Sequence, residues 1–390
     1  MSSCIGNVLR LSIFGQSHSA AIGCSLDGLP AGIPVDAERL QRFMDRRAPG
    51  ARDTSTERRE ADAVHLIAGV ADGHTCGAPL AAIIQNTNTR SRDYAELRRK
   101  PRPGHADWPA FERYGNWHDV AGGGHFSGRL TAPLCAAGGV ALQALERAGI
   151  TVAAHIQVLG PAKAGVSEPS FLALSGSAAP VDKISRRDDT FERCGVPMVD
   201  GDAAERAREL ILEAKDDLDS VGGIVECGVW GLPAGVGDPM FDGLENRIAH
   251  IAFGIPAVKG VEFGIGFTAA GLYGSEDNDP YAAAPNGAAR PVTNNAGGIL
   301  GGISTGAPLV WRCAVKPTPS IGQVQHTVDL ARGEDAELTV RGRHDPCIVP
   351  RAVPVVEAAC ALALLDALLE DGRYPTPDPR PLAEPAPAGE

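Results

Sequence analysis

Apolar residues recur along this chain with two different periods, and the periods separate predicted helices from predicted strands. Helical spacing predicts helices over 35–44, 131–147, 202–218, 241–252 and 353–369. Asp36 suits the N-cap of the first helix, and Gly149 suits a stop after the second. Short β-branched runs predict strands over 9–14, 22–26, 224–229, 308–315 and 336–340. The segment 353–369 is strongly apolar, so we expect a buried helix there.

Two short patterns occur twice and in the same order. In Cys24–Gly32 the string Gly-Leu-Pro-Ala-Gly begins four residues after the cysteine, and Cys227–Gly235 repeats this arrangement. An Ala-Gly-Gly and a later Ala-Pro-Leu occur within 121–134 and again, at the same separation, within 296–309. We interpret the repeats as an internal duplication of a β/α unit, whose halves pack into one body with a site between them.

The chain of 390 residues has ordinary globular proportions, with 44% hydrophobic and 22% charged residues. It has no long uninterrupted apolar run and no signal-peptide pattern, so we expect no membrane span and a cytoplasmic location. Nine cysteines without a Cys-x-x-Cys pair predict reduced thiols, and no Cys/His cluster has the spacing of a metal site. We expect one domain over 1–373 and a disordered Pro- and Ala-rich tail over 374–390.

The formal net charge of −12 argues against a general nucleic-acid-binding protein. The charge is uneven, because residues 39–102 contain 13 Lys and Arg against 8 Asp and Glu. A solvated face with salt bridges and a local anion-binding surface both agree with this composition. Since aromatic residues are few in the segment, the second interpretation indicates a small anion and not RNA.

Three segments place a histidine beside glycine or proline, which fix tight turns. They are 14–19, 102–107 and 342–347, and they contain His18, His105 and His344. A histidine on such a turn is held in place, and its charge changes near neutral pH. Two of the segments also contain an arginine and an aspartate, which suit proton transfer around an anionic substrate. Their spread along the chain predicts an active site assembled by the whole fold.

Glycine-rich loops are further candidates for ligand binding. Gly122–Arg129 leads into a predicted helix, where backbone N–H groups bind phosphate well, but a tight packing turn explains the same glycines equally. The loop lacks both the dinucleotide fingerprint and the Gly-Lys-Ser/Thr of a P-loop. Asn294–Gly302 and Lys316–Ser320 resemble ligand-cradling loops, and the cation and hydroxyls of the second suit a phosphate or a flavin edge.

Together the segments 14–18, 27–34, 102–107, 295–302, 316–320 and 342–354 resemble chorismate synthase, in register from about Gly6 to Leu369. The strings Arg-Pro-Gly-His-Ala-Asp and Arg-His-Asp-Pro-Cys are the most specific. The resemblance implies a single α+β domain, a β-α-β sandwich with internally duplicated halves and helices packed between antiparallel sheets. It also implies a carbon–oxygen lyase that converts 5-enolpyruvylshikimate 3-phosphate to chorismate and phosphate. This 1,4-anti elimination depends on reduced FMN and is the last step of the shikimate pathway toward aromatic amino acids.

The resemblance gives each matched residue a role. His105 corresponds to the acid near the leaving phosphate, and His18, with Ser17 beside it, to the histidine near the reduced flavin. Asp345 corresponds to the carboxylate near the flavin that assists transfer of the substrate's C6 proton. The implied anion-binding residues are Arg47, Arg102, Arg129 and Arg343. The implied flavin contacts are His125, Phe126, Ser127, Ala257, Gly301, Lys316, Pro317, Thr318, Pro319, Ser320 and Arg343.

The chain departs from the family pattern at flavin and substrate contacts. Gly15–Ser19 reads Gly-Gln-Ser-His-Ser where Gly-Glu-Ser-His-Gly is commoner, and His125-Phe126 replaces Arg-Ser. Asp53 takes the place of an arginine, although Arg52 lies one position away. Because the histidines, Asp345 and most arginines remain, we interpret the chain as a diverged member that keeps its activity.

The chain is too short to add a separate NAD(P)H-dependent flavin reductase, so we expect reduced FMN from an external reductase or another source. The family further implies a homotetramer. Three alternatives remain. A flavin-binding scaffold or sensor without lyase activity is favoured by the altered flavin loop, but the retained His18, His105 and Asp345 count against it. Another phosphate-handling enzyme, such as a kinase, is disfavoured by the missing P-loop lysine. A bifunctional enzyme would reduce its own FMN with NADPH.

Overall fold

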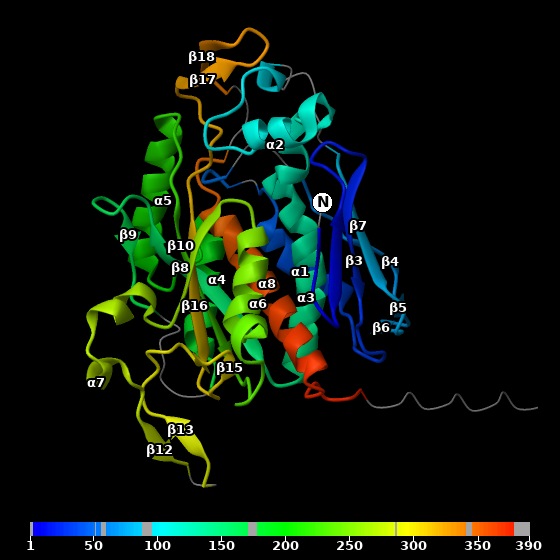
Figure 1. Cartoon of the computed structure of the whole chain (residues 1–390), viewed down its shortest axis with the longest axis vertical. Coiled ribbons are helices and arrows are strands. Elements are labelled where there is room, and N and C mark those ends of the chain that lie inside the picture. Colours follow the sequence, from blue (N-terminus) through cyan, green and yellow to red (C-terminus); the bar gives the residue numbers. More distant parts are fainter. Residues whose placement is uncertain are drawn as a thin grey trace, which may run out of the picture.

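The protein is described by a computed structural model over residues 3–50, 52–55, 60–87, 96–170, 178–284, 287–340 and 345–377. Two five-stranded antiparallel sheets enclose a layer of helices (Figure 1). In spatial order, the first sheet contains β1 (Cys4–Ile5), β2 (Arg10–Phe14), β3 (Ala21–Asp27), β7 (Leu80–Gln85) and β4 (His65–Ala68). The second contains β11 (Val258–Phe263), β16 (Leu309–Val315), β10 (Gly223–Trp230), β8 (Thr151–Leu159) and β9 (Val166–Ser167). The enclosed helices are α1 (Ala37–Arg47), α3 (Thr131–Arg147), α6 (Leu244–Gly254) and α8 (Val349–Glu370).

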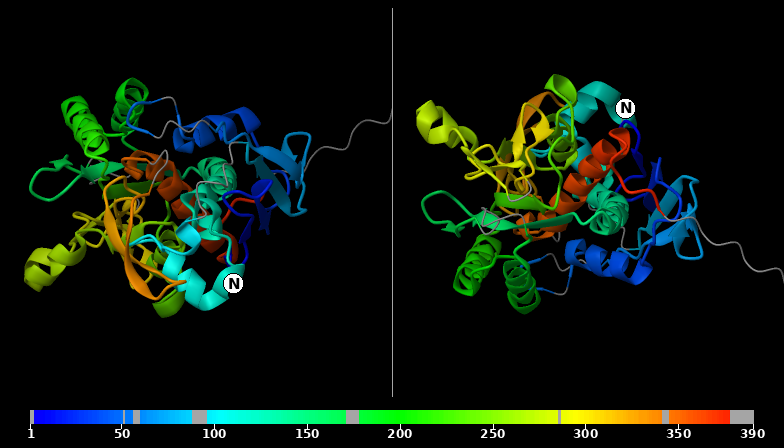
Figure 2. Two further views of the ribbon diagram at one scale, coloured as in Figure 1. Left: turned by 90° about the horizontal axis from the view of Figure 1, so that it is seen from above. Right: turned by 90° about the horizontal axis from the view of Figure 1, so that it is seen from below.

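The other elements surround this sandwich (Figure 2). The remaining helices are α2 (Asp107–Tyr114), α4 (Val181–Cys194), α5 (Gly201–Asp216) and α7 (Gly274–Asp277). The remaining strands form hairpins: β5 (Val70–Ala71) with β6 (His74–Thr75), β12 (Tyr281–Ala283) with β13 (Ala289–Pro291), β14 (Ile299–Leu300) with β15 (Ile303–Ser304), and β17 (Gln325–Asp329) with β18 (Glu334–Leu338). Ile184 of α4 packs on Ala153 and Trp230, which point away from the helix layer.

The order of elements repeats between the two halves of the chain. The first half runs β2-β3-α1-β4-β7-α3, and the second runs β8-β10-α6-β11-β16-α8. Equivalent strands also have equivalent neighbours, because β2-β3-β7-β4 and β8-β10-β16-β11 are the orders within the two sheets. The predicted α+β sandwich with duplicated halves is therefore confirmed. Each half contributes one sheet and two helices to the common core.

The Gly-Leu-Pro-Ala-Gly repeats occupy equivalent turns that are held in the same way. Thr75 Oγ1 donates a hydrogen bond to the carbonyl of Pro30 at 2.6 Å. Ser304 Oγ donates to the carbonyl of Pro233, also at 2.6 Å. Gly28 and its counterpart Gly231 have φ of 92° and 82°, and a β-carbon on either would lie within 2.1 Å of a backbone oxygen. Only glycine fits this turn in both halves.

The second predicted repeat is wrong in its first copy. The Ala-Gly-Gly within 121–134 belongs to η4 (Ala121–Phe126), a 3₁₀ segment before α3, whereas 296–309 leads into β16. In the fold, Ala307-Pro308-Leu309 corresponds to Ala78-Pro79-Leu80, which leads into β7. The chain is rich in glycine and alanine, so an accidental match looked as specific as the true one.

The buried helix α8 begins already at Val349 and runs through the centre of the molecule against α3. A β-carbon on Gly138 of α3 would lie 2.3 Å from Cβ of Ala358, so this glycine lets the two helices approach closely. By length and composition α8 could cross a membrane, but 94% of its apolar window is buried inside the protein. We therefore describe α8 as the core helix of the sandwich.

The cysteines and the start of the predicted tail are also placed. The nine cysteines, all among the described residues, are free thiols, and only Cys4 and Cys76 are exposed. Tyr374, which the prediction assigned to the tail, is buried, and its hydroxyl donates to the carbonyl of Ala144 at 3.2 Å. The ordered body thus includes Tyr374. Residues 378–390 of the predicted tail lie outside the described residues.

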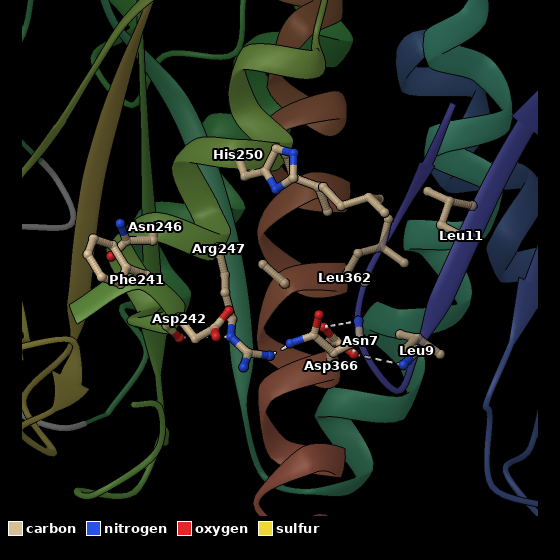
Figure 3. Close-up of a pocket in the computed structure, with 14 residues that line it drawn as sticks. Asn7, Leu9, Leu11, Phe241, Asp242, Asn246, Arg247, His250, Leu362 and Asp366 are labelled. Atoms are coloured by element: carbon tan, nitrogen blue, oxygen red, sulfur yellow. Dashed lines mark hydrogen bonds and ion pairs between the residues drawn. The ribbon is translucent and has the colours of Figure 1, made fainter. Parts of the chain in front are cut away.

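A small cavity of about 90 Å³ lies where the N-terminal loop meets α6 and α8 (Figure 3). At its edge, Asp366 is a buried carboxylate on α8. It accepts hydrogen bonds from the backbone N–H groups of Asn7, Val8 and Leu9 at 3.0, 2.9 and 2.7 Å. Arg247 of α6 lies 3.3 Å from the same carboxylate. This joint ties the start of the first sheet to the helix layer.

We expect Asp366→Asn to lower the free energy of unfolding by about 3 kcal/mol. The substitution removes the negative charge that three backbone N–H groups and the guanidinium of Arg247 share. Thermal melting of the variant against the wild type measures the effect. Glu38→Gln, at an exposed ion pair of 4.0 Å, is the control and should change stability by less than about 0.5 kcal/mol. Equal melting temperatures for Asp366→Asn and the wild type would contradict a stabilising role of this joint.

Candidate active site

A cavity of about 600 Å³ lies at the end of the helix layer that is uppermost in Figure 1. Its walls come from equivalent segments of the two halves, namely the ends of α1 and α6 and the connections β7–α3 and β16–α8. The volume is typical of a small-molecule site. The predicted site residues that line it are Arg47, Arg102, His105, His125, Phe126, Ser127, Arg129, Ala257, Lys316, Thr318, Pro319, Ser320 and Asp345.

Asp107, at the start of α2, orients both His105 and Arg102. Its carboxylate accepts from Arg102 Nε at 2.7 Å and Nη2 at 2.8 Å, and it lies 2.6 Å from His105 Nδ1. Burial alone would raise the pKa of Asp107, but hydrogen bonds from Arg102 and His105 hold this pKa well below its usual range. An ionised carboxylate only accepts hydrogen bonds, so His105 carries a proton on Nδ1 and has Nε2 for proton transfer.

The lowered pKa of Asp107 predicts how stability depends on pH. The ionised carboxylate stabilises the fold above its unfolded pKa of about 3.9, and this contribution is lost as the pH falls through the lower folded pKa. We expect Asp107→Asn to lower the melting temperature at neutral pH and the difference from wild type to shrink below about pH 4. Melting curves of both proteins between neutral and acidic pH test this. A difference that is independent of pH would contradict a role for the charge.

The glycine loop packs between the two predicted catalytic histidines. A β-carbon on Gly122 would lie 2.3 Å from Cε1 of His18, and one on Gly123 would lie 3.1 Å from Nε2 of His105. Both glycines have positive φ, at 60° and 84°. Ser17 is buried, and its side chain lies next to Gly122 on the same side as His18. Close packing explains these glycines, and Ser17 and His18 lie behind the loop, outside the cavity lining.

Three of the four predicted anion-binding arginines line the cavity, and Arg343 lies outside the described residues. Arg47 and Arg129 are buried, and each forms an ion pair with the buried carboxylate of Asp62. The Nη2 group of Arg129 is buried and donates to no acceptor among the described residues. An anionic ligand in the cavity would give this donor a partner.

On the opposite half, Asp345 lies beside the first turn of α8. Arg351 forms an ion pair with its Oδ2, and Ser55 Oγ donates to its Oδ1 at 3.2 Å. Arg351 Nε also donates to the carbonyl of Arg47 at 2.9 Å. Thr318 Oγ1 donates to the backbone carbonyl of Asp345 at 3.2 Å. These contacts join Asp345 to the arginine wall and to the predicted flavin loop.

The predicted flavin loop Lys316–Ser320 runs along the same wall. Burial lowers the pKa of Lys316, and the nearby charge of Lys259 lowers it further. The N–H of Lys316 donates to the carbonyl of Ala257 at 2.9 Å, and Ala257 has a φ of 75°. Strained backbone at a non-glycine residue beside a cavity is typical of functional sites.

The side chains in the cavity fit a flavin that carries a phosphate. Lys316 and Lys259 supply positive charge, and the hydroxyls of Thr318 and Ser320 supply hydrogen bonds. Large apolar side chains suit a planar ring system, and two of them, Phe126 and Phe253, are 39% and 55% exposed. Exposed aromatic rings at the wall of a cavity are typical of a ligand surface.

Other predicted flavin contacts are placed differently. His125 Nδ1 lies 2.7 Å from the carbonyl of Gly15, and Nε2 lies 2.7 Å from Ser3 Oγ. Both ring nitrogens thus have protein partners, which leaves the ring carbons and the backbone of His125 for a ligand. Gly301 lies in the β14–β15 turn, at the end of β16 far from the cavity (Figure 1). Pro317 is exposed and is not part of the lining.

Arg52 does not replace the arginine that the family has at position 53. Its guanidinium donates to the carbonyl of Phe191 in α4 and lies 4.0 Å from the centre of that ring. Asp53 forms an ion pair with Arg208 of α5. Both side chains are therefore engaged by the outer helices, and neither lines the cavity.

The roles of Asp107, Asp62, Arg351 and Lys259 in the site were not predicted from the sequence. Asp107 had a local signal, because it lies two residues after His105 on the same turn. Asp62, Arg351 and Lys259 had none, because their partners are distant in the sequence.

A cavity lined by arginine and lysine, with a histidine oriented by a carboxylate, is typical of enzymes that bind a small polyanion and move a proton. A family model described as chorismate synthase matches residues 9–369. The chain is 46% identical over 372 residues to the chorismate synthase of Lancefieldella parvula, covering 94% of this chain and 96% of that one. It is 44% identical over 379 residues to that of Methanosarcina barkeri, covering 97% and 98%.

A crystal structure of chorismate synthase matches the fold with a TM-score of 0.71 and 27% sequence identity, over 94% of this chain and 93% of that one. The chain belongs to the chorismate synthase family. This family consists of lyases of the shikimate pathway, which leads to the aromatic amino acids. Membership implies a small-molecule substrate and a flavin cofactor.

Proposed function

We propose that this chain catalyses the 1,4-anti elimination of phosphate from 5-enolpyruvylshikimate 3-phosphate, which gives chorismate and inorganic phosphate and depends on reduced FMN. The observation that supports this most is the His105–Asp107 pair, which lies beside Arg102 in a cavity lined by further arginines. The substrate carries one phosphate and two carboxylates, so its charge matches this wall.

Arginines bind the anionic groups of the substrate. Arg47 and Arg129 are held from behind by Asp62, and the buried Nη2 of Arg129 is a donor for a substrate oxygen. Arg102 is fixed in two directions, because it donates to Asp107 and, through Nη1, to Ser320 Oγ at 3.1 Å. Guanidinium groups that are already oriented lose little entropy when the substrate binds.

His105 donates a proton from Nε2 to the departing phosphate. Asp107 keeps the proton on Nδ1 and stabilises the charged imidazolium, while Arg102 neutralises charge on the leaving group. Asp345, held by Arg351, assists removal of the substrate's C6 proton. His18 balances charge from behind Gly122, with Ser17 beside it.

Reduced FMN, when bound, supplies the electron-rich ring that this elimination requires. Lys316, Thr318 and Ser320 would hold its phosphate, and the exposed ring of Phe126 would shield it from water. The contacts predicted for His125, Ser127, Ala257, Pro319 and Arg343 complete the proposed flavin site within one chain, whereas Gly301 and Pro317 do not line its cavity.

The test is an anaerobic assay with photoreduced FMN and 5-enolpyruvylshikimate 3-phosphate. Phosphate release and product absorbance are followed in parallel, and equal amounts of phosphate and chorismate support the proposal. Tight FMN binding without turnover would make the chain a flavin protein that is not a lyase.

We also propose that the chain is monofunctional and acts as a homotetramer in the cytoplasm, with reduced FMN from an external reductase or another source. Exposed aromatic side chains near α7 and in β12, such as Phe267 and Tyr281, support an oligomer. Anaerobic incubation with NADPH and FMN should show no NADPH oxidation. Light scattering after size-exclusion chromatography measures the oligomeric state.

A further inference from the structure

Asp62 is a buried carboxylate directly behind the cavity. Its side chain is 0% exposed, and Asp62 is not among the residues that line the cavity. One carboxylate oxygen accepts from Nη1 of Arg47 and the other from Nη1 of Arg129. These arginines come from the end of α1 and from the turn before α3, and they are 82 residues apart in the sequence. Asp62 thus contacts both arginines directly, with one carboxylate oxygen for each.

The backbone around Asp62 is built to place this carboxylate. Asp62 has a φ of 46°, a left-handed conformation that a non-glycine residue adopts only where its surroundings enforce it. Gln41 of α1 fixes the turn from both sides, because its amide donates to the carbonyl of Ala61 at 3.3 Å and accepts from the N–H of Val64 at 3.1 Å. The turn and α1 therefore form one unit.

The other donors of the arginines show which groups are left for a ligand. Arg47 Nε donates to Thr131 Oγ1 at 3.1 Å, and its Nη2 donates to the carbonyl of Gly128 at 3.2 Å. Arg129 Nε donates to Asn86 Oδ1 at 3.1 Å and lies 3.1 Å from Glu60. After these contacts, the buried Nη2 of Arg129 has no acceptor in the described part of the chain.

We propose that Asp62 is a positioning residue that fixes Arg47 and Arg129 side by side as one anion subsite of the cavity. The identity of the substrate in this inference rests on the proposed function, whereas the existence of the subsite does not. Asp62 acts only through the two guanidinium groups. Without it, two like charges would repel each other, and each long side chain would turn away from the other.

The direction in which anion affinity changes when Asp62 is replaced distinguishes positioning of the arginines from competition with the ligand. If Asp62 merely competed with the ligand for the arginines, removal of its negative charge would strengthen anion binding. If Asp62 positions the arginines, its removal weakens anion binding although the site becomes more positive. The carboxylate is inaccessible and each oxygen already serves one arginine, so the geometry favours positioning.

The test is Asp62→Asn, which keeps the size of the side chain but turns an amide donor toward one of the two guanidinium groups. Calorimetric titration of the full-length, flavin-free protein with inorganic phosphate, and separately with 5-enolpyruvylshikimate 3-phosphate, measures the subsite. We expect both dissociation constants to rise roughly 10- to 100-fold. FMN affinity, measured by fluorescence quenching, should change less than threefold.

Asp366→Asn is the matched control, because Asp366 is also a buried aspartate paired with an arginine, but it lies outside the cavity. It should lose stability and keep phosphate affinity. Unchanged or tighter phosphate binding by Asp62→Asn would overturn the proposal. If Asp62→Asn does not fold, Asp62→Glu keeps the charge and displaces it, and normal phosphate affinity in that variant would overturn the proposal.

The phosphate titration also separates this inference from the proposed function. A wild-type protein that binds phosphate but does not turn over the substrate would refute the lyase proposal and leave the subsite testable. A wild type that turns over, with an Asp62→Asn variant of normal affinity for both ligands, would refute only the role of Asp62.

Discussion

Replacing His105 by alanine should lower turnover roughly 10²- to 10⁴-fold and leave FMN affinity nearly intact. The imidazole is held by Asp107 at 2.6 Å and lines the cavity, so its loss removes the group that protonates the leaving phosphate. Arg102 keeps its contacts to Asp107 and Ser320 in the variant, so substrate binding should weaken much less than turnover. Anaerobic steady-state kinetics with photoreduced FMN separate the two effects.

The control is His65→Ala, at an exposed histidine on β4 outside the cavity, which should keep wild-type turnover. Loss of FMN binding in His105→Ala would contradict a role as the acid, because it would make the histidine a flavin ligand. A turnover that falls less than about tenfold would also contradict it, since general acid catalysis contributes more than that.

Gly122→Ala should reduce turnover by about 10²-fold or more, although the change adds a single methyl group. The added carbon would lie 2.3 Å from Cε1 of His18 and 2.6 Å from Ser17 Oγ, and the residue has a φ of 60°. Ser17 cannot withdraw easily, because it is buried and its N–H donates to the carbonyl of Gly124. The loop must therefore shift, and it carries the adjoining Gly123 away from His105.

Gly149→Ala is the control for backbone strain. Gly149 also has a positive φ, at 76°, but an added carbon would have no neighbour within 4 Å in the described part of the chain. It should cost about 1 kcal/mol of stability and leave turnover unchanged. Equal kinetics for Gly122→Ala and Gly149→Ala would show that the packing against His18 has no catalytic consequence.

The elements that could be predicted from the sequence are those specified by local signals. Helix α3 has the predicted bounds, because an alanine-rich run is followed by a glycine that ends it. Asp36 is the N-cap of α1 as predicted, and its side chain accepts from the N–H of Arg39. The Gly-Leu-Pro-Ala-Gly repeats revealed the duplication, because a turn with positive φ restricts the sequence directly.

Elements specified by tertiary contacts could not be predicted in this way. Strand β8 was missed, because it contains neighbouring alanines and a buried histidine where β-branched residues would normally mark a strand. That histidine, His155, is accommodated by Glu168 and Glu226, which come from other segments of the second sheet and its surroundings. Asp62 was missed for the same reason, since its function lies in two arginines that only the fold brings together.

The resemblance to the family identified most residues of the cavity, but not their supports. It gave roles to His105 and Asp345 but none to Asp107 and Arg351, which determine where these side chains lie. It also placed Gly301 with the flavin contacts, whereas in one copy of the chain Gly301 lies far from the cavity. A motif marks the groups that do chemistry, while the groups that orient them are scattered and follow from packing.

The cavity is lined by corresponding segments of both halves, and this has a consequence for its ancestry. A half-length ancestor that paired with a copy of itself would have formed a symmetric cavity, with each copy supplying the same residues twice. Fusion of two such genes would free each copy to change alone. The present asymmetry fits this history, since the β7–α3 connection supplies His105 and the β16–α8 connection supplies Lys316 and Asp345. Independent change of the two halves would then explain why one molecule has a single site to which each half contributes different residues.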